Sequence, residues 1–253
     1  MTVEKALYNY IIRLGDNALI LGQRLGEWCG HAHQLETDIA LTNVALDQIG
    51  QARILLSEAA SMEGPDRTED HLAFHRDEKH FKNNLLVELE NGDFARTITR
   101  QFLFDIYQYY LLKELTKSKN DFLKGYAEKS LKEVTYHRNL SSDWVIRLGD
   151  GTQVSHDKMQ EALENLWRYT GELFEMDETD EVLISAGFVP DLNEIKSTWE
   201  KDVREVLTEA TLTMPDMDAY MASGGRKGIH TEYMGYILAE MQYLPRTMPE
   251  AKW

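Results

Sequence analysis

The sequence predicts an all-α protein made of long helices, and two observations support this prediction. Apolar residues recur at steps of three and four along nearly the whole chain, which is the period of a helix with one buried face, and strict alternation is scarce. The chain of 253 residues has five prolines, and only Pro65 lies before the last quarter. Because proline interrupts helices, its scarcity permits long ones. We therefore expect an all-α fold.

Stop signals between the periodic stretches place the expected helices in order. The stretch GHAHQL ends the first helix, and Gly64 with Pro65 ends the second. Asp191, followed three residues later by Glu194, is typical of a capping box at the start of a later helix. The expected helices are about 3–29, 36–62, 68–90, 93–115, 121–148, 153–174, 191–210 and 231–244. On the second of them, the side expected to be buried carries Ile39, Leu46, Ile49, Ala52 and Leu56.

The lengths of these helices favour one architecture. Helices of 20 to 28 residues extend about 30 to 42 Å, and four of them in antiparallel pairs predict a ferritin-like four-helix bundle. We expect the core bundle over about 3–149 and additional C-terminal helices over about 153–247. No linker or internal repeat is visible, so the prediction is a single domain over 1–253.

Composition and charge exclude several classes of protein. Hydrophobic residues make up 43% of the chain, which excludes a disordered protein. The net charge of −16 argues against nucleic acid or an anionic membrane as the main partner. Cys29 is the one cysteine, which suits a reducing compartment. Since no secretory signal and no uncharged run of membrane-spanning length is present, we expect a cytoplasmic protein.

A ferritin-like bundle often holds two irons between its helices, and its ligands follow a known spacing. Each of two helices supplies a Glu-x-x-His pair, but this sequence contains no such pair. Counting from the turns instead places Asp105 at mid-height of one helix and Val134-x-x-His137 opposite it, with valine where the acid would stand. The same count puts Gln48-x-x-Gln51 at the pair position of the second helix.

Such a set is not expected to bind iron, because glutamine is a weak ligand for hard cations and valine is no ligand. We expect Gln48 and Gln51 to bridge helices as buried amides, and His137 to hydrogen-bond Asp105 or a neighbour. The alternative is a metal enzyme with a non-standard site, in which the helix register is shifted by a residue or two. The residues available to that site are Asp16, Asp47, Asp105, Glu133 and His137.

Two other groups of possible ligands favour structural roles. The densest histidine cluster lies in a strongly polar segment that is typical of a solvated face, and it consists of His71, His75, Asp77 and His80. Cys29 stands beside His31 and His33 but lacks a further ligand, so we expect it to pack in the interior.

One glycine-rich basic loop, SGGRKGIHTE over 223–232, interrupts the acidic chain. It precedes a helix, so its amides with Arg226 and Lys227 could meet an anion or a partner. It lacks the spacing of a phosphate-binding P-loop. The alternatives are a plain turn with Thr231 as N-cap and an acyl-CoA-binding module built around the loop.

The stretch QFLFDIYQYYLL over 101–112 is apolar or aromatic on opposite sides of its helix. A helix of this kind is buried from more than one direction. Either the additional helices cover it or another subunit does.

Several segments together resemble a known family. They are LGDNALILGQRLGEWCGHA, ALDQIGQAR, NGDFARTITRQFLFD, KEVTYHRN, LWRYTGELF and GGRKGIHTEYMGYILAEMQYL. In this order they are similar to the C subunits of ring-1,2-phenylacetyl-CoA epoxidases, the multicomponent oxygenases of phenylacetate catabolism. The resemblance covers about Leu14 to Trp253.

The resemblance implies a function and a set of partners. Such a complex uses O2 to form an epoxide on the aromatic ring of phenylacetyl-CoA, and NADPH supplies electrons through a reductase subunit with flavin and iron–sulfur centres. The di-iron site belongs to the A subunit, the C subunit is its non-catalytic structural counterpart, and a small B subunit joins such pairs. The A subunit's ligand positions fall on Gln48, Gln51, Asp105, Val134 and His137. No catalytic residue and no cofactor is therefore expected in this chain, although the loop of Arg226 and Lys227 could lie near the CoA tail.

Overall fold

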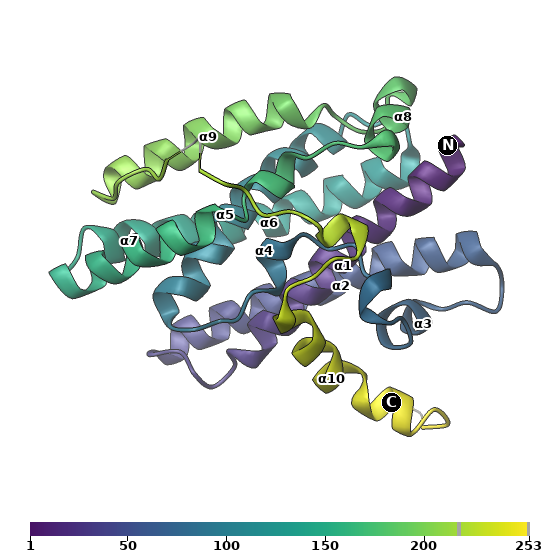
Figure 1. The fold of residues 1–253 in the computed structure, drawn as a ribbon, viewed down its shortest axis with the longest axis horizontal. Coiled ribbons are helices and arrows are strands. Elements are labelled where there is room, and N and C mark those ends of the chain that lie inside the picture. Colours follow the sequence, from purple (N-terminus) through teal and green to yellow (C-terminus); the bar gives the residue numbers. More distant parts are fainter. Residues whose placement is uncertain (217–218, 252–253) are drawn as a thin grey trace. The chain divides into compact units, whose positions relative to one another are not determined.

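The computed structural model describes residues 1–216 and 219–251 of the chain, and this part is helical without a strand (Figure 1). The all-α prediction is confirmed, and the long helices α1, α2, α5 and α6 are those expected of a ferritin-like bundle. The α-helices are α1 (Val3–Glu27), α2 (Leu35–Glu63), α3 (Glu69–Phe74), α4 (Leu85–Glu88), α5 (Phe94–Leu115), α6 (Asp121–Gly149), α7 (Gln153–Trp167), α8 (Glu178–Ala186), α9 (Leu192–Glu209) and α10 (Glu232–Thr247). Short 3-10 helices lie at Glu78–His80, Gly171–Phe174 and Gly225–Lys227. None of the described helices combines the length and apolar character needed to cross a membrane.

One expected helix is wrong. The segment 68–90 folds as α3, a 3-10 turn and α4, with extended backbone between them. Side chains of α1 bind that extended backbone, since the N–H of Lys82 donates to Asp16 and the N–H of Asn84 donates to Asn17 Oδ1. These tertiary hydrogen bonds replace the ones that a continuous helix would have made.

The helices between α6 and α9 also differ from those expected. Helix α7 ends at Trp167, short of the expected 174, and α8 was not expected at all. The signals for α8 are nevertheless in the sequence. Asp177 and Asp180 form a capping box at its start, and Gly187, with φ of +74°, ends it in the left-handed conformation. At α9, the Asp191 side chain accepts from the N–H of Asn193 and so caps the helix, but it does not form the expected capping box with Glu194.

The chain divides into two compact units, each made of two stretches of sequence. The first contains Met1–Ala6 and Asn91–Ala222, and the second contains Leu7–Glu90 and Ser223–Trp253. The expectation of a single domain stays a prediction.

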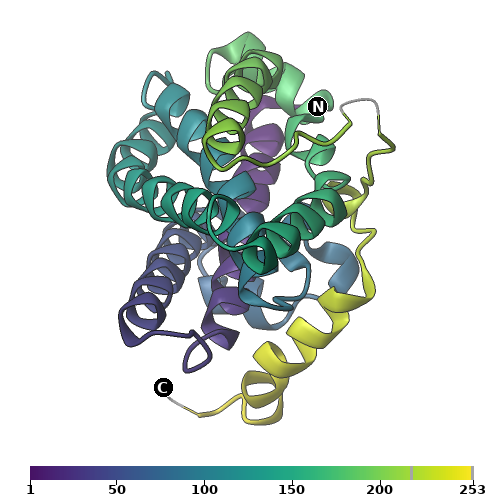
Figure 2. The same ribbon diagram turned by 90° about the vertical axis from the view of Figure 1, so that its left-hand side faces the viewer.

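In the first unit, α5 and α6 form a pair joined by a short turn, and α7 and α9 pack on them (Figures 1 and 2). Trp199 of α9 donates its indole N–H to the carbonyl oxygen of Leu103 on α5 at 3.0 Å. The ring of Trp199 also lies 5.6 Å from that of Trp167 on α7. The additional helices therefore cover the part of α5 that is apolar on opposite sides. Of the two alternatives for this stretch, the additional helices or another subunit, the structure shows the first.

In the second unit, α1 and α2 approach closely at small residues. A Cβ on Gly15 would lie 2.8 Å from Leu56 Cδ2, and a Cβ on Gly22 would lie 2.8 Å from Ile49 Cδ1. Such glycines let two helix backbones come together.

The outer face of α2 corrects one expectation about the core. Ala52 and Leu56 are buried as expected, but Ile39 and Leu46 are 52% and 63% exposed, and Leu35 is 70% exposed. The buried side of α2 is instead centred on Leu41, Val44 and Gln48. Apolar residues occur on both sides of this helix, so periodicity alone did not distinguish which side faces the interior.

Candidate functional site

The residue pair Asp105 and His137 lies on facing helices of the first unit, in its interior. Asp105 on α5 is fully buried, and its carboxylate oxygens accept from Gln101 Nε2 and, at 2.8 Å, from Ser141 Oγ. His137 on α6 is buried and close enough for its positive charge to act on Asp105. Gln101 precedes Asp105 by one helical turn, and Ser141 follows His137 by one turn, so each helix contributes a polar pair to one point.

The environment of Asp105 changes its acidity. Burial raises the pKa of Asp105 to about 6, because a charged carboxylate loses its hydration in the interior. The positive charge of His137 and the hydrogen bonds from Ser141 and Gln101 act in the opposite direction and lower it. With both oxygens occupied by protein donors, this carboxylate links α5 to α6.

We expect Asp105→Asn to reduce the pH dependence of stability. The folded-state pKa of about 6 lies above the ordinary aspartate value of 3.8, so the ionisation of Asp105 lowers the stability of the fold progressively between about pH 4 and pH 6. One pKa unit corresponds to about 1.4 kcal/mol, so the cost reaches about 3 kcal/mol above pH 6. Relative to the wild type, the variant should gain stability as the pH rises from 4 to 8, as measured by urea unfolding. Asp143→Asn, on the exposed side of α6, is the matched control. Parallel pH profiles for Asp105→Asn and the wild type would contradict the assignment.

The remaining predicted positions provide no acidic ligand. Val134 is fully buried on α6, one turn before His137. Gln48 and Gln51 are buried on α2, in the second unit. A di-iron centre needs carboxylates to neutralise its charge, and two amides with an aliphatic side chain do not fit it.

The alternative metal ligands are placed as follows. Asp16 on α1 is fully buried and paired with Arg76, whose Nη1 donates to Asp16 Oδ2 at 3.0 Å and whose Nη2 donates to the other oxygen. The backbone N–H of Lys82 donates to the same carboxylate at 2.8 Å. Asp47 and Glu133 are partly exposed. In the described part of the chain, no three or more His, Cys, Asp or Glu side chains are grouped to hold a metal ion.

The glycine-rich loop lies directly against the segment that follows α3. A Cβ on Gly225 would be 2.2 Å from the carbonyl oxygen of Asn83, and a Cβ on Gly228 would be 2.1 Å from that of Lys79. Gly228 also has a φ of +78°, a conformation that glycine adopts without strain. The glycines therefore permit close backbone contact. Arg226 Nε donates to Asn84 Oδ1 at 3.3 Å, and Lys227 is exposed.

That contact surrounds a buried carboxylate, Glu88, which was not among the residues predicted from the sequence. Its Oε2 accepts from Asn83 Nδ2 at 2.8 Å and lies 2.7 Å from His230 Nδ1. Its Oε1 accepts from the N–H and the hydroxyl of Thr231, at 2.6 and 2.8 Å. The only signal in the sequence was an acid within the apolar run LLVEL.

The surroundings of His230 favour the protonated form of its ring. Its Nδ1 faces Glu88, and its Nε2 lies 3.1 Å from the carbonyl oxygen of Phe81, so both ring nitrogens face acceptors. Burial lowers the pKa of His230, but the hydrogen bond and charge of Glu88, the Phe81 carbonyl and the charge of Glu78 outweigh burial and raise it. Thr231 occupies the N-cap position of α10 as expected, yet its hydroxyl binds Glu88 and does not cap the helix.

The other candidate ligands lie near the surface. His75 and His80 are exposed, and His71 Nδ1 lies 3.0 Å from Thr68 Oγ1. Cys29 is exposed, so the expectation that it packs in the interior is wrong. It follows the buried Trp28, in the turn after the end of α1.

These features define an all-α protein of long helices, in which the predicted ligand positions Gln48, Gln51 and Val134 are buried and carry no acid. The whole chain, residues 1–253, matches the family described as phenylacetic acid catabolic protein, and it therefore belongs to that family. It is 50% identical over 244 residues to the C subunit of the 1,2-phenylacetyl-CoA epoxidase of Escherichia coli (strain K12), and this match covers 96% of this chain and 98% of that protein. The resemblance predicted from the sequence segments is confirmed.

Proposed function

We propose that this chain is a non-catalytic structural subunit of a multicomponent di-iron monooxygenase that epoxidises the aromatic ring of phenylacetyl-CoA. The relative from Escherichia coli is named as one subunit of a phenylacetyl-CoA epoxidase. The observation that supports a non-catalytic role is the donor chemistry: Gln48, Gln51 and Val134, the positions that turn spacing predicts for ligands, are buried and carry no acid.

Such a subunit would act by packing against the catalytic subunit and stabilising it. It covers an apolar face of the catalytic subunit and holds that subunit's ligand helices in place. The exposed apolar face of α2, defined by Leu35, Ile39 and Leu46, suits this role. A helix that is apolar on its inner and outer sides is buried from two directions in the assembled protein. Obligate interfaces of this kind bury more than about 2,000 Å².

The partners follow from the same proposal. The catalytic A subunit would carry the di-iron centre, a small B subunit would join pairs of A and C, and a reductase with flavin and iron–sulfur centres would deliver electrons from NADPH. The cytoplasm is the proposed compartment, since a chain with one cysteine has no intramolecular disulfide to maintain.

Reconstitution tests this proposal. We expect the A subunit with reductase to be inactive or poorly soluble without this chain, and to form the epoxide when this chain is added. Iron should be found with the A subunit in the purified complex. Full turnover in the absence of this chain, or close to two irons retained by this chain alone, would refute the proposal.

A variant of the α2 face makes the test specific. Leu46→Asp should weaken association with the A subunit at least about tenfold, because it places a charge in an apolar contact. Val154→Asp is the matched control, since Val154 is similarly exposed but lies on α7. If the two variants bind the A subunit with equal affinity, the α2 face is not part of the interface.

A further inference from the structure

Helix α10 presents large side chains to the solvent along one side. Tyr236 and Tyr243 are 66% and 65% exposed, and Leu244 and Met248 beside them are also exposed. Tyr236 and Tyr243 are seven residues apart, which places them on the same face of the helix, two turns from each other. Exposed tyrosines in a row are typical of protein interfaces, where they supply rigid contact area. We call these four residues the tyrosine face.

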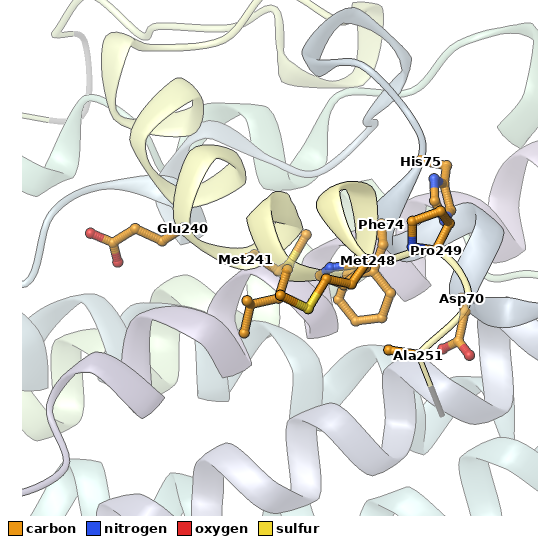
Figure 3. A pocket seen from close by; sticks show the side chains of 10 residues that line it. Asp70, Phe74, His75, Glu240, Met241, Met248, Pro249 and Ala251 are labelled. Atoms are coloured by element: carbon orange, nitrogen blue, oxygen red, sulfur yellow. The ribbon is translucent and has the colours of Figure 1, made fainter. Parts of the chain in front are cut away.

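A groove runs along each side of this face. The first has a volume of about 460 Å³ and lies between α3 and the end of α10. Figure 3 shows Met241 and Met248 beside the ring of Phe74, with Asp70 near Ala251 and His75 near Pro249. The second groove, also about 460 Å³, has a floor of small or apolar residues that includes Gly235, Leu238 and Ala239. Methionine-lined and small-residue grooves accept apolar side chains.

The charges around the grooves indicate what would occupy them. Among the described residues that line them are four acids, Asp70, Asp77, Glu78 and Glu240, and one arginine, Arg246. Arg246 lies 3.4 Å from Asp77 and donates to the carbonyl oxygen of Phe74, so its charge is already directed inward. This leaves an acidic rim around two apolar grooves. A second copy of this chain, with the same rim and a net charge of −16, would be repelled. A polyanionic ligand such as the CoA tail would be repelled as well.

We propose that the tyrosine face of α10 and its two grooves bind a segment of another subunit of the same enzyme, one whose apolar side chains are flanked by lysine or arginine. The apolar side chains enter the grooves, and the basic side chains pair with the acidic rim. This surface lies on a different helix from the α2 face proposed for the A subunit. The inference rests on the proposed function, because it requires that the chain works within a complex of several subunits.

The test uses the reconstituted complex and two kinds of variant. In the first, Tyr236→Ala and Tyr243→Ala are combined, and Tyr220→Ala, an equally exposed tyrosine outside α10, is the control. In the second, Glu240→Lys is compared with Glu128→Lys, an exposed glutamate of α6. The A subunit, the B subunit and the reductase are each titrated separately against the full-length chain, and affinity is measured by sedimentation velocity at two salt concentrations.

We expect the double tyrosine variant to weaken the binding of at least one sister subunit tenfold or more, with less than a twofold effect of Tyr220→Ala. Glu240→Lys should weaken the same subunit and reduce the dependence of its affinity on salt. Unchanged affinities for all subunits in a complex that still forms would overturn the inference but leave the proposed function intact. If the wild-type chain binds no sister subunit, the proposed function itself fails.

Two further outcomes would also overturn the inference. One is a dimer of the wild-type chain that the tyrosine substitutions dissociate, since the occupant would then be a second copy. The other is binding of phenylacetyl-CoA to the isolated chain that the same substitutions abolish, since the grooves would then hold a small molecule.

Discussion

Glu88→Ala is expected to lower the free energy of unfolding by about 3–5 kcal/mol, the range for breaking a buried ion pair from one side. The substitution removes the acceptor of His230, Asn83 and Thr231 together. It leaves the buried ring of His230 and several donors without a carboxylate in a site from which water is excluded. Urea unfolding at pH 6.5 gives the change directly. The control is Glu128→Ala, an exposed position at which about 0.5 kcal/mol or less is expected.

The pH dependence separates the charge of Glu88 from its packing. Because the pKa of His230 is raised in the folded protein, its contribution to stability is complete below about pH 6.5, the ordinary histidine value, and is lost as the pH rises through the folded-state pKa. Glu88→Gln keeps the shape of the side chain but removes the charge, so its stability should change less between pH 6 and pH 9 than that of the wild type. A wild-type stability that is flat over this range would contradict the account of His230.

Asp16→Ala is expected to have an effect of similar size, again about 3–5 kcal/mol. It would leave the guanidinium of Arg76 without its carboxylate partner and the N–H of Lys82 without an acceptor. Arg76 is only 13% exposed, and its guanidinium lies 4.2 Å from the centre of the Phe81 ring, so water can replace little of what is lost. The segment after α3 should detach first, and hydrogen exchange of its amides would detect that.

A paired substitution distinguishes the ion pair from simple packing. Asp16→Leu combined with Arg76→Met removes both charges, and replacing a buried ion pair by apolar groups is often nearly neutral. The double variant should therefore be more stable than Asp16→Ala alone. Glu114→Ala, which breaks an exposed pair with Lys117, should cost less than about 1 kcal/mol. If the double variant is less stable than Asp16→Ala, the charge-pair explanation is wrong.

The limits of sequence-based prediction are clearest in the segment 68–90. Its apolar spacing resembled that of a helix, but Asp16 and Asn17, more than 60 residues away in sequence, bind its backbone in extended form. The same segment contains Glu88, whose partners Thr231 and His230 follow more than 140 residues later. Such contacts leave no local pattern in the sequence.

In the candidate site, too, the positions of residues could be predicted from the sequence but their hydrogen-bond partners could not. Turn counting put Asp105 and His137 on the interior sides of α5 and α6, and both are buried there. It did not identify Ser141 and Gln101 as the hydrogen-bond partners of Asp105. The glycine-rich loop was recognised as unusual, but its glycines serve a close backbone contact that appears only when the chain is folded.

Helical periodicity, sparse proline and the spacing of turns were sufficient for the fold class and for most helix boundaries, because these depend on neighbours within a few residues. The sequence segments were also sufficient for the family. Which side of α2 is buried, which acids lie in the interior and which partners neutralise them depended on packing between distant segments. Burial and desolvation are properties of that packing, and they determine whether a given carboxylate binds a metal, anchors a loop or faces a partner.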